Sequence, residues 1–94
     1  MNIKIDSKAE KFIKNKGENA IEVWLDGCSS WGVGEPTPSV KVGKPDNMEE
    51  YKHYKVGDID VYVKNNVVAK DDELRIKAVK LLWKERLVVE GMVY

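Results

Sequence analysis

The only cysteine of the chain, Cys28, lies in a turn-like stretch, Asp26-Gly27-Cys28-Ser29, directly after an apolar segment. Small neighbours allow backbone amides to approach a thiolate, and hydrogen bonds from those amides lower the pKa of the thiol. An accessible thiolate of low pKa can ligate a soft metal or attack an electrophile. A small, buried and inert cysteine is the alternative, and the residues alone leave both interpretations open.

Other residues near this stretch carry weaker signals. Trp31 could cover the thiol, but we favour an aromatic side chain that anchors the loop in the core. Gly32 and Gly34 do not indicate a phosphate-binding loop, because neither a third glycine nor a Lys-Ser or Lys-Thr pair follows them. His53 has no nucleophile at a recognisable spacing, so we expect a histidine on a surface strand.

Acidic residues occur in two short groups, Asp58 with Asp60 and the run at positions 71–73. Their spacing is not that of an EF-hand loop, and we expect solvated turns rather than hard-cation sites. One cysteine and one histidine cannot form an internal disulfide or a structural zinc site within one chain. With no pair of nucleophile and general base visible, we expect a protein that is not an enzyme.

Composition predicts one small domain that spans residues 1–94. Apolar residues make up 43% of the chain and charged residues 34%, and 16 basic residues balance 16 acidic ones. A net charge of zero argues against binding nucleic acid or a membrane surface by bulk electrostatics. The charged N-terminus is unlike a signal peptide, and no apolar stretch is long enough to span a bilayer. We therefore expect a cytoplasmic protein with a reduced thiol.

The charges are distributed unevenly along the chain. Residues 1–16 contain five lysines against Asp6 and Glu10, and residues 74–94 contain five basic residues against Glu85 and Glu90. These two basic segments could form one patch, although we favour the solvated faces of neighbouring elements.

The pattern of the first half predicts strand, helix and strand. Residues 3–5 alternate as a short strand, and a helix follows over Ser7–Lys16, with Ser7 and Glu10 as a capping box and Gly17 as the left-handed stop. Residues 20–25 read as a strand and residues 26–39 as an irregular loop that is long for so small a domain. Residues 40–42 return to strand alternation.

The second half reads as short strands. Residues 51–56 and 59–63 flank Gly57-Asp58 as a hairpin, and further strands are expected at 67–69, 74–78, 87–89 and 92–94. Residues 79–84 are ambiguous between strand and helical turn, and Trp83 and Tyr94 are expected to be core or edge aromatics. One helix and about seven strands predict a β-rich α+β domain. The predicted core consists of Ile5, Phe12, Ile21, Val23, Leu25, Val61, Val63, Ile76 and Val88.

Nearly the whole chain resembles the HesB-like family, the A-type iron–sulfur carriers. Residues 3–13 are similar to the opening strand and helix of that family, and residues 21–29 to the strand and loop that bear its first cysteine. Residues 58–63 resemble its central strand, and residues 74–79 and 87–89 its late strands. The resemblance implies a folded mixed sheet, or pseudobarrel, with one N-terminal helix packed on it.

A short HesB-like subgroup that includes selenoproteins is more similar still. Its members have a vicinal Cys-Cys or Cys-selenocysteine pair in this loop, followed by Pro-Ser-Val, a Gly-Lys-Pro turn and a Tyr-rich hairpin. Here these stretches read Pro38-Ser39-Val40 and Gly43-Lys44-Pro45. The chain departs from the pattern in two ways: Ser29 occupies the position of the second redox residue, and the Cys-Gly-Cys motif found near the C-terminus of A-type carriers has no counterpart.

The resemblance implies that Cys28 ligates iron, an iron–sulfur cluster or a sulfur species. We expect the neighbouring residues Gly27, Ser29 and Trp31 to belong to the same site. Because one chain offers a single thiolate, further ligands must come from a homodimer, a protein partner, a small thiol, or oxygen atoms of Ser29, Asp26 or Glu35. Two other functions stay open: a degenerate interaction module without a metal site, and a thiol-redox protein with one cysteine. We rank binding first, the interaction module second and redox chemistry last.

Overall fold

The computed structural model describes residues 1–26 and 37–93, which form one α-helix, two short 3-10 helices and nine strands. In chain order these elements are β1 (Asn2–Ile5), α1 (Ser7–Asn15), β2 (Ala20–Asp26), β3 (Thr37–Val42), η1 (Met48–Glu50), β4 (Tyr51–Val56), β5 (Ile59–Lys64), β6 (Val68–Ala69), η2 (Lys70–Asp72), β7 (Glu73–Leu81), β8 (Lys84–Glu90) and β9 (Met92–Val93). The predicted β-rich α+β fold with one N-terminal helix is confirmed.

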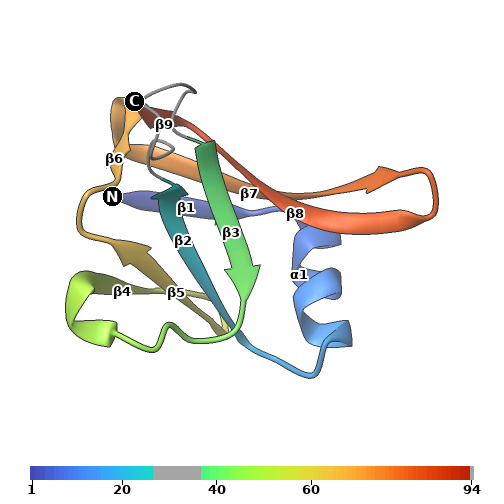
Figure 1. Ribbon diagram of the computed structural model, residues 1–94. Coiled ribbons are helices and arrows are strands. Elements are labelled where there is room, and N and C mark those ends of the chain that lie inside the picture. The colour runs from blue at the N-terminus through green and yellow to red at the C-terminus, as the bar shows by residue number, and fades with distance from the viewer. Residues whose placement is uncertain (27–36, 94) are drawn as a thin grey trace, which may run out of the picture.

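The strands form three sheets that mix parallel and antiparallel pairing. A four-stranded sheet has the order β3-β2-β5-β4, a three-stranded sheet has the order β1-β7-β8, and β6 pairs with β9. The β2–β5 and β1–β7 pairs are parallel, whereas the hairpins are antiparallel. Figure 1 shows the long β7–β8 hairpin reaching past the four-stranded sheet, with α1 beneath it. Within the described residues, β3 and β8 are each an edge strand.

The core lies between the two larger sheets and the helix. Alternate residues of the central strands β2 and β5 are fully or almost fully buried, as the period-two pattern predicted for Ile21, Val23, Val61 and Val63. Ile76 of β7 is buried as predicted, and Ile5 and Leu25 pack against the core while partly exposed. The other buried apolar residues include Ala9, Ile13, Ile59, Leu74 and Met92.

Helix α1 forms where predicted, but its N-terminal cap differs. Asp6 is the N-cap, Ser7 is already helical, and no side chain caps the first turn. The predicted Ser7–Glu10 capping box is therefore wrong, and the Glu10 carboxylate instead accepts a hydrogen bond from Lys14 Nζ at 3.0 Å. Since Lys14 is four residues further on, the pair follows the helical spacing. The C-terminal stop is confirmed, because Gly17 has φ +75° and its N–H donates to the Lys14 carbonyl.

Phe12 in α1 and Val88 in β8 are less buried than predicted. Ile13 is fully buried, while Phe12 is only partly buried. In β8, Leu87 and Val89 are buried, and Val88 between them is not part of the core. Val88 pairs with Lys77 in the β7–β8 register and so lies on the opposite face of the sheet. Three consecutive apolar residues gave no alternation from which the inner face could be chosen.

The ambiguous segment 79–84 is a hairpin end. Strand β7 continues to Leu81 and β8 begins at Lys84, so Leu82 and Trp83 form the two-residue turn. Trp83 is 80% exposed, which corrects the expectation of a core or edge aromatic. Tyr94, the other aromatic in that expectation, lies outside the described residues.

Candidate functional site

The predicted site residues, Cys28 with Gly27, Ser29 and Trp31, lie outside the described residues, as does Glu35. The structure describes the two strands that flank them. Asp26, the last residue of β2, is the register partner of Thr37, the first residue of β3. The segment that carries the cysteine therefore joins two adjacent strand ends.

Strand β2 is held firmly up to this point. Ile21 and Val23 are fully buried, and residues 20–23 pair with β5 on one side while residues 21–26 pair with β3 on the other. Beyond Val23 only the β3 pairing continues, through Trp24 with Ser39 and Leu25 with Pro38. Asp26 is exposed, so its carboxylate is accessible beside the predicted site. The sequence thus places Cys28 two residues after a rigid central strand.

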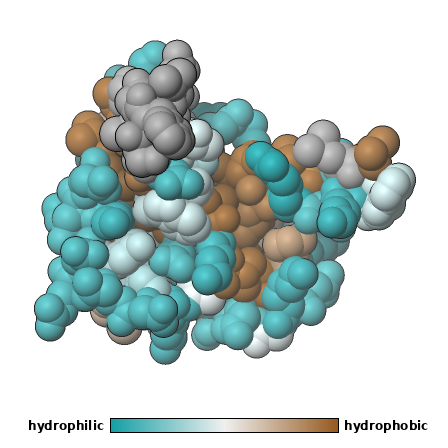
Figure 2. All heavy atoms as spheres, viewed as in Figure 1, coloured by the Kyte–Doolittle hydropathy of each residue, from teal (hydrophilic) through white to brown (hydrophobic). Residues whose placement is uncertain are grey.

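A groove lies next to the start of β3, between the edge strands β3 and β8. Its volume is about 780 Å³. Apolar side chains from four elements line it, namely Phe12, Trp24, Val40, Val42, Leu87 and Val88. Lysine, arginine and glutamate side chains also contribute to the lining. In Figure 2 an apolar strip is visible as a hollow between polar surroundings in this region. We call this surface the β3–β8 groove.

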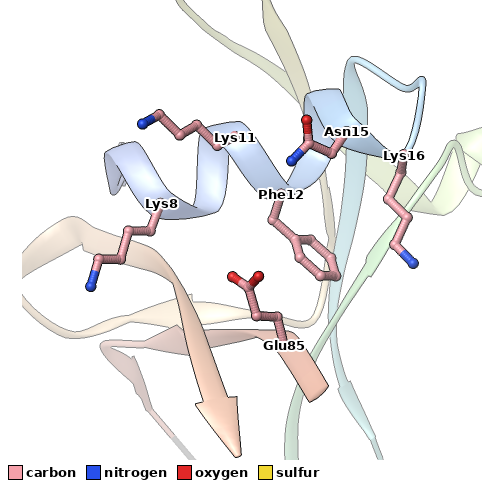
Figure 3. A pocket seen from close by; sticks show the side chains of 6 residues that line it. All are labelled: Lys8, Lys11, Phe12, Asn15, Lys16 and Glu85. Atoms are coloured by element: carbon pink, nitrogen blue, oxygen red, sulfur yellow. The ribbon is translucent and has the colours of Figure 1, made fainter. Parts of the chain in front are cut away.

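A second, more polar hollow of about 430 Å³ lies between α1 and β8. Figure 3 shows Lys8 and Lys11 on the helix, with the Glu85 side chain extending from β8 toward Phe12. Lys16 lies above the Phe12 ring, 5.3 Å from its centroid. The basic helix and the β7–β8 hairpin are therefore neighbours, as the patch interpretation requires. Within the described part of the chain, Lys8, Lys11 and Lys16 form no ion pair.

His53 is an exposed strand histidine, as predicted. Its Nε2 lies 2.8 Å from Oδ1 of Asp60, and its ring stacks on Tyr62 with centroids 5.0 Å apart. These contacts tie β4 to β5 on the surface of the four-stranded sheet. They account for the position of the ring without a nucleophile or a metal.

The acidic groups also have structural partners. Asp58 lies 3.1 Å from Lys14, whose hydrogen bond lowers the pKa of the Asp58 carboxyl. Glu73 contacts Lys4 and Arg75, and the hydrogen bond from Arg75 is the main cause of its lowered pKa. Among residues 1–26 and 37–93, no three His, Cys, Asp or Glu side chains are grouped to hold a metal ion. The described chain alone therefore does not fit a complete cluster site.

Sequence reasoning did not find the β3–β8 groove. Its lining comes from the helix, from two neighbouring strands of one sheet and from the edge of another. Trp24 was the available signal, because its position on β2 alternates with the buried Val23. No local pattern indicates that Val88 lies on the same surface.

Comparisons with known proteins agree with this architecture. The sequence model of the CC/Se motif containing family matches residues 1–92. No curated protein sequence matches the chain significantly. A crystal structure of IscA with the [2Fe-2S] cluster is similar in fold, with a TM-score of 0.67 and 7% sequence identity, over 95% of this chain and 84% of that one. The predicted HesB-like fold is thereby confirmed. Among the described residues, no helix has the length and hydrophobicity needed to cross a membrane.

Proposed function

We propose that this chain, which belongs to the CC/Se motif containing family, binds iron, an iron–sulfur cluster or a sulfur species through the Cys28 thiolate. The observation that carries the proposal is the position of this cysteine in the sequence, directly after strand β2. It is the only cysteine, and it follows β2 by two residues in a chain whose fold is similar to that of a structure with a [2Fe-2S] cluster.

The flanking strands support a fixed position for the ends of the site. Asp26 and Thr37 are direct partners, and β2 is anchored by buried residues on its inner face. Gly27 and Ser29 are small neighbours, and small residues allow backbone amides to approach and stabilise a thiolate. Trp31 is proposed to shield the bound species from water, since an indole ring combines apolar area with a polar edge.

The ligand set of one chain is incomplete. Tetrahedral soft-metal sites and iron–sulfur clusters use about four ligands, and this chain supplies one thiolate. Asp26 is exposed at the end of β2 and can add an oxygen ligand, as can Ser29 and Glu35. We propose that the remaining ligands come from a second chain, a protein partner or a small thiol such as glutathione. Binding is then weak and dependent on added thiol.

Anaerobic reconstitution with ferrous iron and sulfide tests the proposal, with and without glutathione. Absorption spectra and a metal count per chain are read for the wild type, for Cys28→Ser and for Ser30→Ala as the matched neighbour control. We expect loading in the wild type and in Ser30→Ala, and none in Cys28→Ser. Ser29→Cys adds a second thiolate and is expected to strengthen loading. Tight loading without thiol that persists in Cys28→Ser would overturn the proposal.

A non-catalytic interaction module is a second candidate function. The observation that favours it is the exposed pair Leu82–Trp83 together with the apolar β3–β8 groove, neither of which involves Cys28. Under this alternative, the Cys28→Ser variant retains every association of the wild type and the wild type takes up no iron. The reconstitution experiment therefore separates the two functions.

A further inference from the structure

The β7–β8 hairpin ends in an exposed apolar turn. Leu82 is 84% exposed and Trp83 is 80% exposed, and they lie between the strand ends Leu81 and Lys84. We call Leu82 and Trp83 the hairpin tip. Figure 1 shows the tip at the far end of the hairpin, beyond helix α1, and Figure 2 shows hydrophobic surface at the end of this projection. The tip therefore projects from the body of the domain.

The backbone at the tip is strained. Leu82 has φ +58°, in the left-handed region that side chains other than those of Asn and Asp rarely adopt. Two-residue hairpin turns favour glycine at such a position. Packing does not explain the leucine, because its side chain is exposed. Strain of this kind is a reason to look for a function of the side chain outside its own chain.

Cations surround the tip on both faces of the hairpin. Lys80 and Lys84 lie within two residues of it, and Arg86 follows on β8. Lys80 opposes Glu85 and Lys84 opposes Leu81 in the strand register, so the two lysines lie on opposite faces. Within the described part of the chain, none of the three cations forms an ion pair. The hairpin end therefore carries three unpaired cations against one carboxylate.

Helix α1 adds a second group of cations. Lys8, Lys11 and Lys16 line the hollow of about 430 Å³ together with Glu85, which lies two residues from Trp83. Figure 3 shows Glu85 extending from β8 toward the helix that carries these lysines. The three lysines form no ion pair within residues 1–26 and 37–93. The two basic segments of the sequence therefore meet at one end of the molecule.

Another exposed apolar residue has the opposite surroundings. Met48 is 46% exposed, and the carboxylates of Asp46, Glu49 and Glu50 belong to residues within two positions of it. Figure 1 shows η1, which carries Met48, on the other side of the molecule from the hairpin tip. The zero net charge of the chain therefore conceals a local excess of cations around the tip. The argument from net charge excludes attraction of the whole chain to a polyanion, but not attraction of this end.

We propose that the hairpin tip docks on an anionic lipid surface, with Leu82 and Trp83 inserted at the depth of the headgroups and Lys80 and Lys84 bound to lipid phosphates. Tryptophan favours the boundary between hydrocarbon and headgroups, because its ring is apolar and its indole N–H is polar. Peptide segments that lie in this boundary combine Trp and Leu with Lys and Arg. Every residue that carries the proposal is described, and the chemistry of Cys28 plays no part in it.

The apolar character and the shape of the tip favour lipid over other polyanions. Cations alone would serve equally well for an acidic protein or a nucleic acid. An indole ring can stack on a nucleic-acid base, but a leucine side chain has no aromatic face with which to do so. A convex tip needs a preformed pocket in a protein partner, whereas a fluid bilayer accommodates it without one. Charge, composition and shape together therefore indicate a lipid surface.

The spacing of the cations fits docking with the tip first. Strand residues rise about 3.3 Å each, so Lys80 and Lys84 lie within about 7 Å of the inserted residues along the hairpin. This separation is shorter than the screening length of about 8–10 Å at physiological salt. A cation so close to an anionic surface strengthens binding about fivefold. The lysines of α1 lie further back along the hairpin and contribute less.

Co-sedimentation of the metal-free chain with vesicles tests the proposal. We expect binding to an equal mixture of phosphatidylcholine and phosphatidylglycerol, with a loss at high salt, and none to phosphatidylcholine alone. Trp83→Ala should weaken binding about tenfold or more, and Lys80→Glu with Lys84→Glu roughly 25-fold or more. No binding to the mixed vesicles, or binding that both variants leave unchanged, overturns the proposal.

Matched variants far from the tip control for general effects of charge and apolar area. Met48→Ala removes an exposed apolar side chain in acidic surroundings. Lys44→Glu with Lys52→Glu makes the same change in net charge as the double variant at the tip. We expect Met48→Ala to bind as the wild type does, and the Lys44–Lys52 variant to lose much less than the tip variant. Equal losses at both places would refute docking through the tip.

Tryptophan fluorescence distinguishes insertion from electrostatic contact alone. We expect the emission of the wild type to shift to shorter wavelength on the mixed vesicles and to be quenched by brominated lipids. The difference between the wild type and Trp83→Phe isolates this ring from the other two tryptophans of the chain. A shift that persists in Trp83→Phe, or binding with no shift, would show that the tip is not inserted and would contradict the proposal.

The orientation and the class of partner have their own tests. Docking with the tip first predicts that Lys80→Glu with Lys84→Glu weakens binding more than Lys8→Glu with Lys11→Glu, and the reverse order would exclude it. Polyglutamate and oligothymidylate are the soluble polyanions for comparison. Tighter binding to either polymer than to the vesicles, if lost in Trp83→Ala, would replace the lipid surface by an acidic protein or a nucleic acid.

Leu82→Gly separates docking from folding. Glycine relieves the positive φ, so resistance to urea is expected to be retained or raised while vesicle binding weakens. Unchanged vesicle binding in Leu82→Gly would contradict insertion of the leucine. Cys28→Ser is expected to bind vesicles as the wild type does, and Trp83→Ala to load iron as the wild type does. These two variants therefore show whether lipid docking or the proposed binding through Cys28 has failed.

Discussion

Asp26 and Thr37 are the last register pair of the β2–β3 ladder, so the segment that contains Cys28 begins and ends at directly opposite backbone positions. Its two ends are fixed by strands that pair over six residues on each side. The two ends of this segment are therefore located relative to the central strand β2. Cys28 follows Asp26 by two residues.

The Cys28 thiol is predicted to be accessible and to titrate below the value of about 8.5 for free cysteine. The reason is its Gly27 and Ser29 neighbours, whose backbone amides can stabilise the thiolate. The rate of alkylation by iodoacetamide, measured against pH in the native protein, gives the pKa directly. A thiol that reacts only after denaturation would instead indicate a buried and inert cysteine.

The alternating strands were the part of the fold that sequence patterns predicted best. In β2 and β5 the predicted inner residues are buried, namely Ile21, Val23, Val61 and Val63. Trp24 and Tyr62, on the other face of these strands, are also apolar, so the alternation is not strictly between apolar and polar residues. The pattern failed at residues 87–89, where three aliphatic residues in succession left the inner face of the strand undecided, and it did not show that Phe12 is less deeply buried than Ile13. The predicted capping box was wrong because the helix begins one residue earlier than expected. Asp6 is the N-cap, and Ser7 is the first helical residue.

The candidate site was less predictable than the fold. Cysteine chemistry and turn composition identified Cys28, but ligand number depends on what a second chain or a small thiol contributes. The β3–β8 groove could not be read from the sequence, because Phe12, Trp24 and Val88 meet only after the sheets have packed. The exposure of Trp83 was missed for a related reason. The sequence of residues 79–84 is compatible with a buried turn and with a projecting turn. The turn projects because strands β7 and β8 extend to Leu81 and from Lys84.

Ile13→Ala is predicted to destabilise the protein more than Phe12→Ala does. Ile13 is fully buried in the core cluster, and truncating such a residue costs about 2–5 kcal/mol. Phe12 is only partly buried and lines both hollows, so its loss should fall below the roughly 3–5 kcal/mol of a fully buried phenylalanine. Urea unfolding followed by circular dichroism gives both values. The reverse order would mean that Phe12, rather than Ile13, is the more deeply packed of the two side chains.

Gly91→Ala is predicted to be more damaging than the matched substitution Gly17→Ala. Both glycines have positive φ, +94° and +75°, so both alanines pay a conformational cost of about 1–3 kcal/mol. A Cβ at position 91 would also lie 2.5 Å from the carbonyl oxygen of Glu73, whereas nothing lies within 4 Å of a Cβ at position 17. The difference between the two unfolding free energies isolates this clash. Equal losses would show that the backbone around Glu73 moves aside freely.

The Tyr51 phenol is predicted to have a raised pKa in the folded protein, and the free energy of unfolding is predicted to fall at high pH as a result. Burial raises the pKa of Tyr51 to about 12, and a hydrogen bond to Glu22 adds to the effect. In the unfolded chain the phenol ionises near the usual value of about 10. Above that pH the unfolded state loses a proton that the folded state still holds, so the equilibrium shifts toward unfolding until the folded phenol also ionises near 12. The stabilising contribution is therefore complete below about pH 10.

The ultraviolet absorbance of tyrosinate gives the titration, and the curve of wild type minus Tyr51→Phe isolates this one of the four tyrosines. We expect the difference curve to have its midpoint near 12 in the folded protein. Unfolding free energies measured across the same pH range should decline less steeply in Tyr51→Phe than in the wild type, because the variant has no phenol at position 51 to ionise. A difference curve centred on the ordinary tyrosine value would show that Tyr51 is neither desolvated nor bonded to Glu22 in solution.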